Sequence, residues 1–144
     1  MNVHTILRNK GKSVVTIHPD ATVERAVAVL RLRGVGALVV SDDGESVVGI
    51  VSERDIVEAI VRYGSELLGI SVEEVMTSPV VTCDPDDSVA ELMAEMTNRR
   101  IRHFPVVEDG RLCGIVSIGD LVKSRLDEIE FEAHSMRSFI AGAA

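Results

Sequence analysis

The chain contains two copies of one sequence pattern, placed one after the other. Residues 14–20 (VVTIHPD) align with residues 80–86 (VVTCDPD) at an offset of 66 positions. One residue is then lost from a turn in the second copy, so residues 49–55 (GIVSERD) align with residues 114–120 (GIVSIGD) at an offset of 65. An ordered series of matches at a nearly constant offset indicates an internal repeat, whose copies stack to share a buried core.

The pattern within each copy predicts the order β-α-β-β-α. A short run of β-branched residues ends at a Pro-Asp turn, and apolar residues at helical spacing follow it. A second apolar run, a turn containing Asp-Gly and a third run then predict a β-hairpin, after which a helix begins near Ser52 or Ser117. Ser88 and Glu91 predict a capping box at the start of the first helix of the second copy. The predicted strands are residues 14–17, 37–40, 47–51, 80–83, 104–107 and 112–116.

We therefore expect an α/β fold of the α+β type, in which the tandem β-α-β-β-α copies pack sheet to sheet with pseudo-twofold symmetry. A copy of about 60 residues is too small to bury a good core alone, so the two should form one unit. We expect a first domain at residues 1–65, a second at residues 66–127, and a C-terminal helix and tail at residues 128–144. Residues 4–7 and 72–76 are expected to open the first and second copies.

The C-terminal stretch carries apolar residues on one helical face, and two uses of that face remain open. They are Leu126, Ile129, Ala133, Met136 and Ile140. The face could pack on its own domain, or it could form a contact between two copies of the chain.

Composition removes several classes of function. The net charge of −8 and an aromatic content of only 3% disfavour binding to nucleic acid, which repels acidic surfaces and stacks its bases on aromatic rings. No apolar run is long enough to span a bilayer, and residues 1–4 lack the features of a signal peptide. Cys83 and Cys113 have no metal-ligand spacing and suit a reducing compartment as small buried residues. We expect a cytoplasmic protein without a bound metal and without a membrane partner.

Motifs for catalysis are also missing. Residues 34–37 (GVGA) lack the third glycine of a dinucleotide-binding loop, and they follow a predicted helix and precede a strand, which reverses the order that such a loop needs. His103 has no evident nucleophile nearby in the sequence, and the other histidines stand alone. We do not expect an enzyme.

The repeated motifs resemble a pair of CBS domains, the arrangement called a Bateman module, over about residues 3–127. The resemblance rests on VVT followed by PD in both copies, on FPVV at residues 104–107, and on the paired GIVSERD and GIVSIGD segments. Small stand-alone bacterial CBS-pair proteins are the most similar. The resemblance implies a regulatory homodimer that binds an adenosyl ligand (AMP, ADP, ATP, NAD(H) or S-adenosylmethionine) in clefts between the copies and acts on an unknown downstream protein.

The same resemblance implies which residues hold the ligand. Asp120 and Asp55 match the aspartate that binds the ribose hydroxyls, and Ser117 and Ser52 match the hydroxyl that contacts ribose or phosphate. From the residues alone, Ser-x-x-Asp before an apolar helix is also an ordinary helix cap, and the two roles are compatible. Exposed amides at a helix start favour a phosphate as well.

The two clefts are expected to differ. Arg102 and His103 stand close to Arg99 and Arg100, whereas the first copy has Gly36 and Ala37 at the positions of Arg102 and His103. Four basic residues within five positions of an acidic chain favour a local anion site, although a solvated helix end is the alternative. The predicted Asp120 cleft comprises Ser117, Asp120, Arg102, His103, Arg100, Ser13, Val14, Val15, Val35 and Gly36. The predicted Asp55 cleft comprises Ser52, Arg54, Asp55, Pro79, Val80 and Val81.

From these residues we expect a sensor of energy or redox state, with AMP favoured in the Asp120 cleft and an NAD(H)-like ligand possible in either. The alternative is a dimeric module that binds no nucleotide and serves only in structure or protein interaction.

Overall fold

The computed structural model describes residues 1–11 and 13–143, so Ala144, the last residue of the expected tail, lies outside the described residues. The chain is mixed α/β, as predicted. In chain order its elements are α1 (Val3–Lys10), β1 (Thr16–Ile17), α2 (Val23–Arg33), β2 (Ala37–Val40), β3 (Gly49–Ser52), α3 (Glu53–Tyr63), the 3-10 helix η1 (Gly64–Gly69), α4 (Val72–Val75), α5 (Val89–Arg99), β4 (His103–Glu108), β5 (Arg111–Ser117) and α6 (Ile118–Ala143).

The first copy forms a three-stranded sheet in the order β1-β2-β3. Strand β1 runs parallel to β2, with Thr16 opposite Val39, and β2 runs antiparallel to β3, with Ala37 opposite Ser52. All four residues of β2 are buried, as expected for a central strand. Strand β1 is shorter than the strand predicted over residues 14–17. Strand β3 begins and ends later than the strand predicted over residues 47–51.

The second copy keeps the predicted hairpin but not the predicted strand over residues 80–83. Strands β4 and β5 pair antiparallel, and only Cys83 joins them, through one parallel bridge to Val106. The Cys83 amide donates to the Pro105 carbonyl at 2.9 Å, and the Val107 amide donates to the Cys83 carbonyl at 2.9 Å. Proline has no amide hydrogen, so Pro105 cannot donate to the carbonyl of Val81, two residues before Cys83, which is the bond that would continue a parallel ladder. Val39 fills this position in the first copy, where β1 forms.

The two copies end their first helices differently. Thr22 caps α2 and Ser88 caps α5, each by accepting a hydrogen bond from the amide three residues on. The Ser88 contact, to the Glu91 amide, is one half of the predicted capping box. Gly34 then ends α2 in the left-handed conformation (φ 64°), and Arg100 ends α5 in the same conformation (φ 56°). A side chain other than glycine is strained there by about 1–2 kcal/mol.

The short helices α1 and α4 are exchanged between the copies. The segments 4–7 and 72–76 were expected to open the first and second copies, but each packs on the other one. The Val3 amide donates to the Asp87 carbonyl at 3.1 Å, and the Val72 amide donates to the Ala21 carbonyl at 2.8 Å, at matching places of the repeat. Val3 is fully buried in the core of the second copy, and Val72 in that of the first.

Glycines in the third strand of each copy make room for this exchange. A Cβ added at Gly114 would lie 2.6 Å from the Leu7 side chain, and a Cβ added at Gly49 would collide with Met76. The third strand of each copy therefore accepts an apolar side chain from the segment that was expected to open the other copy. This reciprocal packing makes the chain one pseudo-twofold unit.

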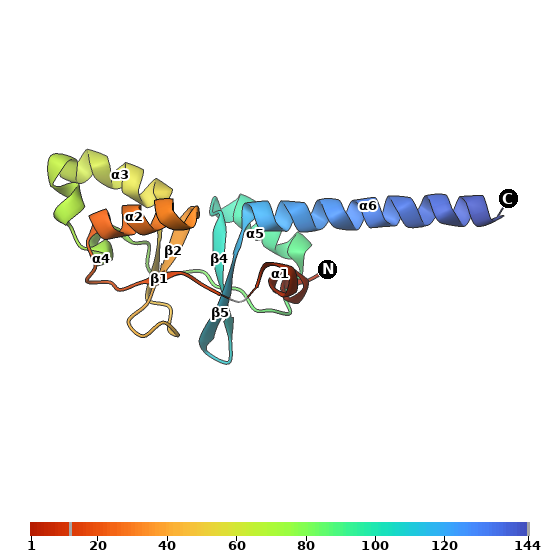
Figure 1. The fold of residues 1–144 in the computed structure, drawn as a ribbon, viewed down its shortest axis with the longest axis horizontal. Coiled ribbons are helices and arrows are strands. Elements are labelled where there is room, and N and C mark those ends of the chain that lie inside the picture. Colours follow the sequence, from red (N-terminus) through yellow and green to blue (C-terminus); the bar gives the residue numbers. More distant parts are fainter. Residues whose placement is uncertain (12, 144) are drawn as a thin grey trace.

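Helix α6 runs unbroken through the boundary expected near residue 128 and projects beyond the rest of the molecule (Figure 1). Its first turns are anchored, since Leu121 is fully buried and Ser124 is 8% exposed. Beyond them, Leu126, Met136 and Ile140 are exposed, so this part does not pack on its own domain. Within residues 1–11 and 13–143, no helix is both long and apolar enough to cross a membrane.

Candidate functional site

The Ser-x-x-Asp segments form matching turns at the starts of α3 and α6. In α6 the Ser117 amide donates to Asp120 Oδ2 at 2.9 Å, and the Asp120 amide donates to Ser117 Oγ at 3.1 Å. In α3 the Ser52 amide donates to Asp55 Oδ2 at 2.8 Å, and the Asp55 amide donates to Ser52 Oγ at 3.3 Å. The capping role of these residues is therefore present in both copies, and it holds each carboxylate at a helix N-terminus.

The carboxylate of Asp120 forms an ion pair with a residue from the other end of the chain. Lys10, the last residue of α1, places its Nζ 2.7 Å from Asp120 Oδ2 and donates to the Ile115 carbonyl at 3.0 Å. Burial by itself would raise the pKa of Asp120, but the hydrogen bonds from Lys10 and from the Ser117 amide outweigh burial and lower it. Asp120 is therefore a carboxylate at neutral pH, and Lys10 is its counter-ion.

The carboxylate of Asp55 has a neutral partner instead. Thr77 Oγ1 donates to Asp55 Oδ1 at 2.9 Å, and the Thr77 backbone pairs with Ile50 in strand β3. Ile50 corresponds to Ile115, whose carbonyl accepts from Lys10. The place beside the aspartate is thus filled by a hydroxyl group in one copy and by an ammonium group in the other, from residues that do not align in the repeat.

His103 connects the Asp120 site to the first copy. It lies opposite Ser117 in the β4–β5 hairpin, and a Cβ added at Gly36 would lie 3.4 Å from its ring. Burial, followed by the nearby charge of Lys10, lowers the pKa of His103, while Asp120 and Glu53 act in the opposite direction. The structure therefore gathers residues of both copies around one cation and one carboxylate.

The basic group spreads over the end of α5. Arg102 and Arg100 are exposed, and Arg99 Nε lies 2.6 Å from Glu95 Oε2 in a pair within α5. Arg54, expected in the Asp55 cleft, donates through Nη1 to the Arg100 carbonyl at 3.2 Å and thereby joins the two copies. In the described part of the chain, Arg100 and Arg102 are the arginines of this group whose side chains form no ion pair, and Arg102 directly precedes His103.

The remaining predicted residues lie in irregular segments or line a groove. The segment that precedes β1 contains Ser13, Val14 and Val15. Of these residues, Val15 packs against the core of the first copy and Ser13 is exposed. Residues 79–81 lie between α4 and the Cys83 bridge, and Val81 is exposed.

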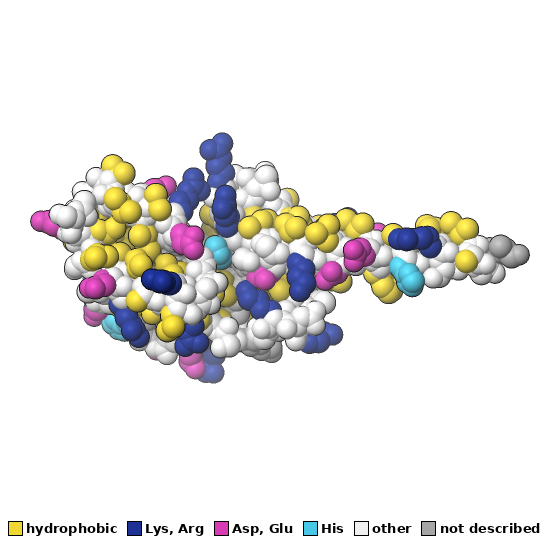
Figure 2. Space-filling view, turned by 45° about the horizontal axis from the view of Figure 1, so that its top comes forward, with side chains coloured by type: hydrophobic (Ala, Val, Ile, Leu, Met, Phe, Trp, Pro, Cys, Tyr) yellow, Lys and Arg dark blue, Asp and Glu magenta, His cyan; other side chains and the backbone are white. Residues whose placement is uncertain are grey.

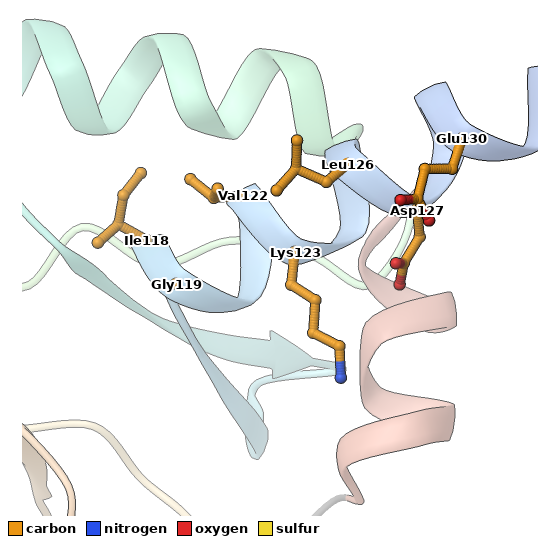
Figure 3. A pocket seen from close by; sticks show the side chains of 7 residues that line it. All are labelled: Ile118, Gly119, Val122, Lys123, Leu126, Asp127 and Glu130. Atoms are coloured by element: carbon orange, nitrogen blue, oxygen red, sulfur yellow. The ribbon is translucent and has the colours of Figure 1, made fainter. Parts of the chain in front are cut away.

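Two of the grooves on the described surface contain no predicted aspartate. One, of about 570 Å³, lies between α2 and α3 and includes Val35, Gly36 and Glu53. Through Gly36 it adjoins His103. The other, of about 480 Å³, follows α6 (Figure 3). It is lined by Ile118, Gly119, Val122, Lys123, Leu126, Asp127 and Glu130.

Sequence reasoning missed Lys10 and Thr77, the partners of the two carboxylates. A signal for Lys10 was present, because it continues the apolar stripe of α1 that includes Val3 and Leu7, three and four residues apart. A charge that continues an apolar stripe favours a partner nearby, but the sequence does not say which element provides it. No comparable signal marks Thr77.

Comparison with known proteins places both copies in one family. The model of the CBS domain matches residues 10–62 and 72–127. A CBS-domain containing protein of Agrobacterium tumefaciens, ATU1752, shares 44% identity at a TM-score of 0.84, over 87% of this chain and 99% of that one. The mitochondrial CBS domain-containing protein CBSX3 of Arabidopsis thaliana is 34% identical over 97% of this chain and 72% of its own length.

One solved relative carries adenosyl ligands. The CBS domain pair of MJ0100, in complex with 5-methylthioadenosine and S-adenosyl-L-methionine, shares 29% identity at a TM-score of 0.75, over 90% of this chain and 98% of that one.

Proposed function

The chain belongs to the CBS domain family and carries two copies of the domain, and on this basis we propose that it is a regulatory protein that binds an adenine nucleotide at the Asp120 site. The observation that carries the proposal is the asymmetry between the two Ser-x-x-Asp turns. Both carboxylates are held alike by their helix starts, but only Asp120 has Lys10, His103 and Arg102 around it.

The chemistry of a nucleotide fits these groups one by one. A ribose presents two neighbouring hydroxyls, and the Asp120 carboxylate can accept hydrogen bonds from both. Lys10 and Arg102 are donors for a phosphate, and the dipole at the start of α6 favours a negative charge there. The ligand complex of MJ0100 supports an adenosyl compound as the ligand class. AMP is the preferred candidate, with ADP, ATP, NAD(H) and S-adenosylmethionine as the others.

Lys10 gives the site a means of reporting occupancy. Lys10 lies 2.7 Å from Asp120 Oδ2, so a ribose that binds both carboxylate oxygens would displace it, and the ligand phosphate would offer it a new partner. Because Lys10 ends α1 and α1 packs on the core of the second copy, this movement shifts a helix that bridges the repeat. Helix α1 then has two positions, one with Lys10 on Asp120 and one with Lys10 displaced. A ligand with a higher affinity for one of these two states increases its population, which can alter a surface that a partner protein recognises.

The Asp55 site is proposed as the weaker of the two. Its carboxylate is already satisfied by Thr77 and the Ser52 amide, and Arg54 is turned toward the Arg100 carbonyl. Ser52, Arg54, Asp55 and residues 79–81 remain candidates for a longer ligand.

A thermal-shift panel tests the proposal. Adenosine, AMP, ADP, ATP, NAD, NADH and S-adenosylmethionine are compared, with GMP as the control for the base. A ligand at a hundred times its dissociation constant adds about 2.7 kcal/mol, which raises the unfolding midpoint by several degrees. Selective stabilisation by an adenosyl compound is expected. No shift with any of them at millimolar concentration would favour the alternative, a module that serves only in structure or protein interaction.

The remaining expectations are part of the proposal. We expect a non-catalytic, cytoplasmic homodimer, although the Arabidopsis relative is named a mitochondrial protein. The proposal assigns no identity to the downstream protein.

A further inference from the structure

The projecting part of α6 carries an apolar seam with a seven-residue period. Its members follow one another at alternating intervals of four and three residues: Val122, Leu126, Ile129, Ala133, Met136 and Ile140. This is the spacing of the a and d positions of a coiled coil, whose average of 3.5 residues per turn keeps the seam facing a second helix.

The seam is not the face that attaches α6 to its own domain. Leu121 and Ser124 are buried against the domain, whereas Ile129 is 46% exposed and Met136 is 61% exposed. Val122 and Leu126 point to the same side of α6, while Lys123 points away from them (Figure 3). Hydrophobic side chains form a band along the projecting helix in the space-filling view (Figure 2).

The charges beside the seam indicate what covers it. The heptad places Arg125 and Glu132 at g positions, with Glu130 and Arg137 at the e positions five residues after them. In a parallel pair each g residue faces the following e residue of its partner. Arg125 would then meet Glu130 of a second copy, and Glu132 would meet Arg137 of a second copy, so both kinds of pair are of opposite charge.

The antiparallel arrangement brings like charges together. If the same core residues stay paired, with Ile129 opposite Ala133 of the other helix, the e positions face each other and so do the g positions. Glu130 would then lie near Glu130, Glu132 near Glu132, and Lys123 near Arg137. The charge pattern therefore favours a parallel partner with this same sequence.

We propose that a second copy of this chain packs along the seam, so that two α6 helices form a parallel two-stranded coiled coil over residues 122–140. Nineteen helical residues span about 28 Å, and the groove along α6 would receive side chains of the second copy at the start of this span. The proposal does not depend on nucleotide binding. A membrane surface fits the seam less well, because Asp127, Glu128, Glu130 and Glu132 surround it and anionic lipids repel acidic residues.

Sedimentation of the full chain over a range of concentrations tests the interface. Ile129→Asp at a d position is expected to raise the dimer dissociation constant at least tenfold. Phe131→Asp is the matched control, because Phe131 is 71% exposed but lies at an f position, outside the seam. A chain that stays monomeric at every concentration, or an equal effect of both substitutions, would overturn the proposal.

Two further readouts test the orientation. Glu132→Arg and Arg137→Glu should each weaken the dimer, and the double variant should restore it. In a Cys113→Ser background, Met136→Cys should oxidise to a disulfide-linked dimer, because d positions of a parallel pair face each other. Cross-linking of Met136→Cys only when it is mixed with Leu126→Cys would overturn the parallel arrangement. The chain could instead stay monomeric and bind to anionic vesicles. If Ile129→Asp abolished that binding, the seam would contact a membrane and the proposal of a second copy would be overturned.

Discussion

Lys10 and Asp120 stand 110 positions apart in the sequence, yet the Lys10 ammonium lies 2.7 Å from the Asp120 carboxylate. The contact exists because α1 packs on the second copy of the repeat and not on the copy that follows it in the chain. It makes the last residue of α1 a competitor of any hydroxyl that binds Asp120 Oδ2, and a donor for any phosphate nearby.

Replacing Lys10 should have opposite effects on the binding of the ribose and on the binding of the phosphate. Lys10→Met is expected to strengthen adenosine binding, because the ribose no longer has to displace an ammonium group. The preference for AMP over adenosine should fall about tenfold, which is 1.4 kcal/mol, because a phosphate donor is lost. Isothermal titration with both ligands measures this ratio, and Lys123→Met on α6 is the control. An equal change for both ligands would exclude the phosphate role of Lys10, and unchanged adenosine binding would exclude its competition with the ribose.

Asp120→Ala should weaken every adenosyl ligand at least tenfold, because the ribose loses its acceptor. The matched control is Asp55→Ala, which removes the same kind of carboxylate from a helix start at a stability cost of about 0.5–2 kcal/mol. Both variants are therefore compared for binding by calorimetry and for unfolding by urea. Equal loss of binding in the two variants would mean that the cap matters and the Asp120 site does not.

Arg102→Ala should weaken AMP much more than adenosine, because the proposed target of Arg102 is the phosphate. The two ligands are titrated side by side. Equal losses for AMP and adenosine would exclude that role.

The left-handed backbone at Arg100 suggests that a basic side chain is retained there at some cost in stability. Arg100→Gly should relieve strain and raise the free energy of unfolding by up to about 1 kcal/mol, since glycine adopts this conformation freely and loses part of the gain through greater freedom when unfolded. Gly34→Ala, at the equivalent position with φ 64°, should lower it. Urea unfolding of both variants checks the pair, and a destabilised Arg100→Gly protein would show that the side chain stabilises the fold.

His103 should make stability depend on pH in the mildly acidic range. Burial, followed by Lys10, lowers its pKa in the folded protein, whereas the unfolded chain keeps the ordinary value of about 6.5. The unfolded state then binds more protons as the pH falls below about 7, so acid lowers the free energy of unfolding. The carboxylate of Asp120, with a lowered pKa, loses its stabilising contribution only at still lower pH.

Urea titrations from neutral pH down to about pH 5 measure this loss, which His103→Asn should reduce because asparagine does not titrate. His4→Asn is the comparison, since His4 is exposed beside Asp86. The same pH dependence in His103→Asn and in the unaltered chain would assign the loss to other groups.

The contact between Gly114 and Leu7 should tolerate no added methyl group. Gly114→Ala would place its Cβ 2.6 Å from Leu7, and overpacking of this kind costs about 1–3 kcal/mol. Gly69→Ala is the control, because nothing lies within 4 Å of a Cβ there. Adding Leu7→Ala to Gly114→Ala should cost less than the sum of the two single substitutions. Strict additivity in urea unfolding would argue against the exchanged packing of α1.

The repeat allowed the element order, both hairpins and the helix caps at Ser52 and Ser117 to be predicted, because these depend on residues close together in the sequence. The prediction of a strand over residues 80–83 was wrong. The pairing of this strand depends on the backbone of Pro105, which lacks an amide hydrogen and lies twenty-two residues after Cys83 in the sequence. The positions of α1 and α4, and with them the partners Lys10 and Thr77, could not be predicted. Both copies have an apolar core that a short helix can cover, and which core it covers depends on contacts between residues far apart in the sequence.

The exchange of α1 also affects how the protein is made. A ribosome releases the N-terminus first, yet the core that holds Val3 and Leu7 includes Phe104 and Leu121 near the far end of the module. The earliest helix therefore has no native surface until nearly the whole repeat has been synthesised, and its contacts span most of the chain. Such long-range closure slows folding and leaves an apolar segment unpaired on the nascent chain. The N-terminal residues are thus the last part of the module to become protected.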